Sequence, residues 1–115
     1  MAIRWEQVVA SAVELPKVEE STSYNTPALK VAGKLMARLR TEAEGGLVVV
    51  CGLDEKEALL ASGSAAFYTT PHYDGYGSII VDLDRVDSAE LRDMIVEAWR
   101  MQAPKTVRRR YDETH

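Results

Sequence analysis

The helix-like and strand-like patterns of this chain do not alternate, and this order constrains the fold more than any other feature. One amphipathic helical pattern opens the chain and another lies near its end, and four strand-like patterns follow the first without a helix between them. Parallel neighbours need a long crossover, usually helical, so an unbroken series of strands predicts antiparallel pairing. The expected order α-β-β-β-β-α-β-β-α predicts an α+β fold, a two-layer sandwich with its helices packed on one face of an antiparallel sheet.

Two long helices are expected, and both carry one apolar stripe at helical spacing. Pro16 should end the first helix near Leu15, and Pro104 bounds the last. The stripe of the first helix comprises Trp5, Val8, Val9, Ala12 and Val13. The stripe of the last helix comprises Leu91, Met94, Ile95, Ala98 and Trp99, after a cap at Asp87-Ser88-Ala89-Glu90.

A short helix is expected in the middle of the chain. Asp54 can accept hydrogen bonds from the first-turn amides, and Glu57 can reach back to complete a capping box. Ala58, Leu59 and Ala61 would pack this helix onto the sheet before Gly63 ends it.

The strand patterns differ in character along the chain. Residues 18–24 are polar and suggest an edge strand or an extended link, whereas the apolar run 47–51 suggests a covered central strand. The remaining strands are expected at residues 29–31, 34–40, 65–69 and 78–83.

The strand expected at residues 34–40 alternates with period two. Leu35, Ala37 and Leu39 would join Leu29 on one face, and Met36 would lie on the other. That other face would carry a basic stripe of Lys30, Lys34, Arg38 and Arg40. Such a stripe suits either a solvated sheet face or contact with phosphates, and a map of the exposed surface would decide between them.

Residues 68–77 crowd tyrosines, a histidine, a proline and two glycines between two strands. Tyr73 and Tyr76 can pack the loop onto the sheet, or they can face outward with His72 as a contact surface. His72 and Asp74 lack a third ligand nearby, so no metal site is expected. Cys51 ends an apolar run and should be a buried hydrophobe. No catalytic residues and no cofactor are expected.

Size and charge limit the remaining possibilities. The chain has 115 residues, which suits one domain over residues 1–104, followed by a charged tail at 105–115 that should fray. No run approaches the ~20 apolar residues of a membrane helix, no signal sequence opens the chain, and a lone cysteine suits the cytoplasm. The net charge of −4 argues against high affinity for DNA.

Several segments together resemble one protein family. The segment Pro27-Ala28-Leu29-Lys30-Val31-Ala32-Gly33-Lys34-Leu35-Met36-Ala37-Arg38-Leu39 is similar to the hairpin of the MmcQ/YjbR family, with Leu29 and Met36 in place of two family aromatics. Residues 68–76 with 79–83, and residues 97–104, resemble later parts of that family. The resemblance implies a CyaY-like fold, related in shape to frataxin, and a proposed DNA-binding role with two wings. It supplies no catalytic residues.

Two functions are therefore expected, both of them non-enzymatic. The first is a binding domain that holds DNA weakly and in a salt-dependent way, with Lys30, Lys34, Arg38 and Arg40 on phosphates and the tyrosines at a wing tip. The second is an adaptor for a protein or a small ligand that uses the loop 68–77. A concave pocket or an exposed aromatic patch beside this loop would favour the second function.

Overall fold

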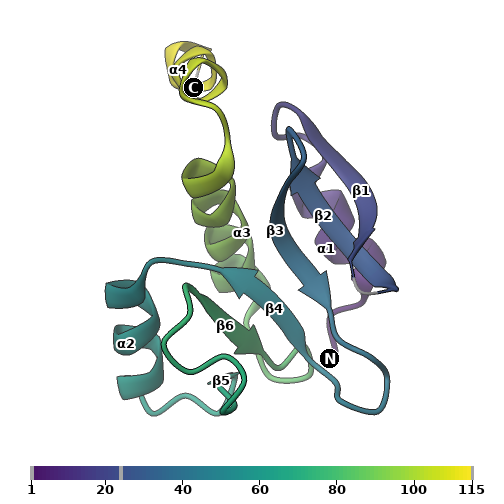
Figure 1. The fold of residues 1–115 in the computed structure, drawn as a ribbon, viewed down its shortest axis with the longest axis vertical. Coiled ribbons are helices and arrows are strands. Elements are labelled where there is room, and N and C mark those ends of the chain that lie inside the picture. Colours follow the sequence, from purple (N-terminus) through teal and green to yellow (C-terminus); the bar gives the residue numbers. More distant parts are fainter. Residues whose placement is uncertain (1, 24, 115) are drawn as a thin grey trace.

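A computed structural model describes residues 2–23 and 25–114 of the chain and contains one antiparallel sheet (Figure 1). The sheet has the strand order β1-β2-β3-β4-β6-β5. Its strands are β1 (Val18–Ser23), β2 (Thr26–Val31), β3 (Lys34–Leu39), β4 (Leu47–Val50), β5 (Phe67–Tyr68) and β6 (Ser78–Val81). The helices are α1 (Trp5–Ala12), α2 (Leu53–Ala61), α3 (Ser88–Gln102) and α4 (Lys105–Thr114).

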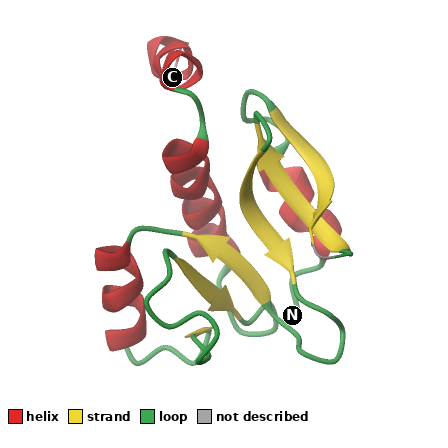
Figure 2. Ribbon diagram, in the orientation of Figure 1, coloured by secondary structure: helices red, strands yellow, loops and turns green. Residues whose placement is uncertain are grey.

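Helices α1 and α3 lie behind one face of the sheet and enclose the main core with it (Figure 2). Every residue of the predicted α3 stripe is buried, and from α1 the residues Val8 and Ala12 are buried. They pack against strand residues that include Leu29, Leu47 and Ile79. The predicted α+β fold with helices against an antiparallel sheet is therefore confirmed. No helix within the described ranges is long and apolar enough to cross a membrane.

Helix starts were predicted with mixed success. The Asp87 side chain accepts hydrogen bonds from the amides of Ala89 and Glu90, so the predicted cap of α3 is confirmed. The predicted cap of α2 is wrong, because Gly52 occupies the N-cap and no side chain caps it. Asp54 lies inside the first turn instead, where its charge favours the helix dipole.

The packing predicted for α2 is wrong for Ala58 and Ala61 and is confirmed only for Leu59, which packs against the edge of the core. Ala58 and Ala61 are exposed, Leu59 is only half-buried, and the one buried residue of this helix is Lys56. Helix α2 is thus held down by a charged side chain rather than by an apolar stripe.

A β-bulge in β3 overturns the predicted alternation of this strand. Leu29 pairs with Ala37 and Lys30 pairs with Leu35, which leaves Met36 as an extra residue between the two pairs. Met36 is fully buried in the helix-side core, whereas Leu35 is half-buried and lines the opposite face. The expectation that Leu35 points into the core and Met36 away from it is wrong.

The charged C-terminal segment forms a helix where a frayed tail was expected. The Tyr111 ring of α4 packs edge-on against Trp99, with 4.9 Å between ring centroids. The Asp112 carboxylate accepts two hydrogen bonds from the Arg100 guanidinium, at 2.9 and 3.3 Å. These contacts attach α4 to the end of α3.

Candidate functional site

The face of the sheet opposite α1 and α3 carries a row of residues that runs across all six strands. Cross-strand pairing places Ser21, Ala28, Arg38, Val48, Ile80 and Tyr68 in successive register. Ala28, Val48 and Ile80 are buried although they lie outside the helix-side core. This second face is therefore partly covered, and Arg38 lies in the middle of it.

The loop between β5 and β6 folds over this second face. The amides of Tyr73 and Asp74 donate to the Thr70 carbonyl, at 2.9 and 3.0 Å, which closes a tight turn. The Tyr73 hydroxyl accepts a hydrogen bond of 2.7 Å from Arg38, whose guanidinium also donates to the Thr26 hydroxyl at 3.2 Å. Tyr73 is thus the inward anchor of the loop.

Lys56 holds the same loop from the side of α2. Its side-chain ammonium donates to the carbonyls of Tyr73 and Tyr76, at 2.6 and 2.9 Å. Only 5% of Lys56 is exposed, so this charged contact is shielded from solvent. Buried hydrogen bonds to a charged group stabilise more than neutral ones, and the two bonds fix the loop conformation around Tyr73.

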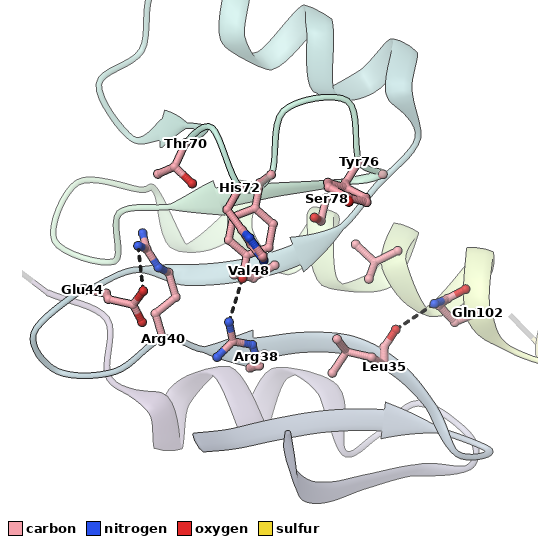
Figure 3. Close-up of a pocket in the computed structure, with 13 residues that line it drawn as sticks. Leu35, Arg38, Arg40, Glu44, Val48, Thr70, His72, Tyr76, Ser78 and Gln102 are labelled. Carbon is pink, nitrogen blue, oxygen red and sulfur yellow. Dashed lines mark hydrogen bonds and ion pairs between the residues drawn. The ribbon is translucent and has the colours of Figure 1, made fainter. Parts of the chain in front are cut away.

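A pocket of about 810 Å³ lies between the loop and the sheet (Figure 3). It is lined by Leu35, Arg38, Arg40, Glu44, Val48, Val50, Thr70, His72, Tyr73, Tyr76, Gly77, Ser78 and Gln102. The lining combines apolar strand residues, aromatic rings and a few charged groups. This composition is typical of sites that bind small ligands.

The two ends of the pocket differ in polarity. In Figure 3, Arg40, Glu44 and Thr70 lie at one end, and Leu35, Tyr76 and Gln102 lie toward the other. The Gln102 amide donates to the Leu35 carbonyl at 2.9 Å, which joins the end of α3 to β3.

Arg40 and Glu44 form a loose ion pair at the charged end. Nη2 of Arg40 lies 3.5 Å from Oε2 of Glu44, and the two side chains are 11% and 49% exposed. Hydrogen bonds from Thr41 hold the pKa of Glu44 below its ordinary value, and the positive charge of Arg40 adds to this effect. The carboxylate is therefore ionised near neutral pH.

The predicted basic stripe does not exist as one face. The bulge leaves Lys30 and Arg38 on the pocket side, while Lys34 pairs with Val31, whose side chain is in the helix-side core. Arg40 follows the end of β3, and its side chain is largely buried at the pocket wall. Of the four residues only Lys34 is well exposed and the other three are half-buried or more, so the stripe interpretation is wrong in its geometry.

The three loop residues named from sequence do gather at the pocket. Tyr73 faces inward, whereas Tyr76 is 63% exposed at the rim. The His72 ring packs edge-on against Tyr73, with 4.9 Å between ring centroids. The described residues contain no group of three or more side chains able to hold a metal ion.

Cys51 is buried, as expected for a small hydrophobe. Burial raises the pKa of its thiol to about 11, and the nearby Glu55 carboxylate adds to this shift. A thiol with so high a pKa is a poor nucleophile at neutral pH.

Sequence reasoning missed two residues that shape the site, Lys56 and Gln102. Both occur in ordinary helical sequence, and their partners are backbone carbonyls of distant segments. One signal was available for Lys56. It shares a helix face with Leu59, so a charged residue occupies the side of α2 that turns toward the protein.

Comparisons with known proteins agree with the resemblance noted in the sequence. A family model described as YjbR matches residues 13–101. Uncharacterized proteins from Mycobacterium bovis and from two strains of Mycobacterium tuberculosis are 34% identical over 86 residues, which is 72% of this chain and 67% of theirs. No solved structure gave a significant match. Because the family model spans all six strands of the sheet and all but the last residue of α3, this chain belongs to the YjbR family.

Proposed function

We propose that this chain is a non-enzymatic binding domain whose ligand site is the pocket beneath the loop between β5 and β6. The observation that carries the proposal is the pocket itself, a hollow of about 810 Å³ beside Tyr73 and Tyr76. Its size lies within the range of roughly 300–1,000 Å³ that is usual for ligand pockets. A concave site at this loop was the feature expected of an adaptor for a protein or a small ligand.

The same geometry weakens the case for DNA binding through the hairpin. Binding to a phosphate backbone needs several exposed cations on one surface. Arg38 is engaged with Tyr73 and Thr26, and Arg40 is largely covered. Duplex DNA is thus the less favoured ligand of this domain.

The proposal also includes a cytoplasmic location, because the chain has a single cysteine and its thiol is buried.

The proposal of a non-enzymatic role rests on the chemistry of the pocket lining. The pocket lining contains the hydroxyls of Thr70 and Ser78, and its only imidazole is that of His72. Nucleophilic catalysis needs a base within hydrogen-bond reach of the nucleophile, and within the described residues neither the Thr70 nor the Ser78 hydroxyl donates a hydrogen bond to a side chain that could act as a base. The role left to these groups is recognition.

The test is a fragment titration followed by amide chemical shifts. We expect small aromatic fragments to shift the amides of the pocket lining in wild-type protein. Ser78→Phe should abolish these shifts, because its ring fills the pocket from β6. Ala10→Phe adds the same bulk at an exposed position of α1 and should leave binding unchanged. Shifts spread evenly over the surface, or unaffected by Ser78→Phe, would rule out the pocket.

A second titration with duplex DNA at low and physiological salt distinguishes the alternative. The pocket proposal expects weak binding that Ser78→Phe does not change. Tight binding with a steep salt dependence, lost on replacing Lys30 and Lys34, would instead assign the hairpin to phosphate contacts.

A further inference from the structure

We propose that the charged end of the pocket binds an oxyanion, a carboxylate or a phosphate monoester, through the guanidinium of Arg40. This inference rests on the proposed function and names the chemical class of its ligand. It also assigns Glu44 a role, as the internal carboxylate that the ligand displaces.

Arg40 carries a positive charge that its surroundings compensate poorly. Its side chain is 11% exposed, and within the described residues its Nε has no hydrogen-bond partner. A buried donor without a partner is destabilising, and a buried charge needs close pairing to offset its lost hydration. The arginine therefore gains from any anion that contacts it more closely than Glu44 does.

Glu44 is a weak partner that a ligand can displace. Its carboxylate lies 3.5 Å from Arg40 Nη2, beyond the usual length of a charge-assisted hydrogen bond. The carboxylate is half-exposed, so solvent weakens its attraction to the guanidinium. Its other oxygen accepts a hydrogen bond of 2.9 Å from the Thr41 hydroxyl, so Glu44 keeps a partner after it leaves Arg40.

The backbone keeps Arg40 in place while its side-chain partner is exchanged. The Arg40 amide donates to the Gly46 carbonyl at 3.0 Å, which closes the turn between β3 and β4. An oxyanion with two oxygens can then pair with the guanidinium as a planar fork, a geometry that arginine favours over lysine.

The rest of the lining also suits an anion with an apolar body. Arg38 and Arg40 outnumber the single carboxylate of Glu44, so the pocket is locally positive on a protein of net charge −4. Thr70 adds a hydroxyl at the charged end. Leu35, Val48 and Val50 supply an apolar wall for a ring or a short chain.

Matched fragment pairs test this inference by affinity. Benzoate is compared with benzamide, and phenyl phosphate with phenol, by NMR titration at constant ionic strength. We expect at least one anion to bind about tenfold tighter than its neutral partner, a difference of about 1.4 kcal/mol. Arg40→Gln should reduce that preference to within about twofold. The tighter of the two anions identifies carboxylate or phosphate as the preferred group.

A second variant protects the test against misfolding of Arg40→Gln. Glu44→Gln removes the competing carboxylate and should tighten anion binding severalfold while leaving the neutral fragments unchanged. Arg92→Gln breaks an exposed ion pair with Glu14 on another surface and serves as the matched control. It should change neither affinity.

The outcomes separate this inference from the proposed function. Equal binding of anions and neutral partners at the pocket would overturn the inference and leave the pocket proposal standing. An anion preference that persists in Arg40→Gln, or no gain in Glu44→Gln, would overturn it as well. Failure of every fragment to shift the pocket amides would overturn the proposed function and this inference together.

Discussion

At the scale of single residues, Lys56 shows how one buried charge can organise a loop. Its ammonium donates to the carbonyls of Tyr73 and Tyr76, and the Tyr73 carbonyl also accepts the Tyr76 amide at 3.1 Å, so the lysine reinforces the turn at both residues. Because Tyr73 also holds Arg38, the lysine indirectly fixes the middle of the pocket. Lys56 thus positions the loop between β5 and β6 without lining the pocket.

Replacing Lys56 with methionine should therefore loosen the loop and leave the fold intact. Methionine keeps most of the side-chain volume and tolerates burial, but it cannot donate a hydrogen bond. We expect a loss of about 2 kcal/mol in the free energy of unfolding, since hydrogen bonds to charged groups contribute about 1.5–3 kcal/mol. Urea unfolding measures this loss, and hydrogen exchange at the amides of Tyr73, Asp74 and Tyr76 should accelerate.

Lys34→Met is the control for this experiment, because Lys34 is exposed on β3. It should change the unfolding free energy by less than about 0.5 kcal/mol. Unchanged exchange at the loop amides in Lys56→Met would contradict the positioning role.

At the scale of elements, the bulge in β3 decides which residues face the pocket. Without the extra residue, alternation would turn Leu35 into the core and expose Met36 beside Arg38. With it, Met36 fills the core, and Leu35 and Arg38 share the pocket face. Bulges often redirect side chains beside functional sites, and here the bulge builds the apolar wall of the pocket.

Alanine substitutions at these two positions test the bulge directly. Met36→Ala should lower the free energy of unfolding by about 2–5 kcal/mol, because it leaves a cavity in the core. Leu35→Ala removes a half-buried side chain and should cost about 1 kcal/mol or less. Chemical denaturation of the two variants gives the comparison, and a larger cost at Leu35 would mean that β3 alternates regularly.

The elements also show what sequence patterns can and cannot predict. Helix α3 was predictable because its cap at Asp87 and its five-residue stripe are local signals. The bulge was not, because either Leu35 or Met36 can fill the core and only pairing with β2 selects between them. Helix α4 was missed because just two of its apolar residues, Val107 and Tyr111, pack against the core, too few to stand out in a basic segment.

At the scale of the whole molecule, the pocket combines segments that are far apart in sequence. Arg40 follows β3, Tyr73 lies in the loop before β6, and Gln102 ends α3. The sequence identifies the loop residues as candidate contacts. Which distant residues meet them at the pocket depends on the sheet order and on the burial of Lys56, and neither follows from a local pattern. The predicted basic stripe was wrong for the same reason, since one bulge redistributes its cations between two faces.

The stability of the whole fold should depend on pH through Cys51. The folded thiol has a pKa of about 11, raised chiefly by burial and further by Glu55, whereas an unfolded cysteine titrates near about 8.5. Below that pH both states keep the proton and the thiol has no effect on stability. As the pH rises toward 11 only the unfolded state ionises, so the free energy of unfolding should fall, by up to about 3 kcal/mol.

Comparison with Cys51→Ala isolates this effect from every other group that changes protonation at high pH. The alanine variant has a cavity and should be less stable near neutral pH, but that difference should shrink between about pH 8.5 and 11 because only the wild type carries the thiol. Urea unfolding of both proteins across this range gives the two profiles. Parallel profiles would mean that the thiol ionises equally well in both states. That outcome would contradict the burial of Cys51 after β4, where only 2% of the residue is exposed.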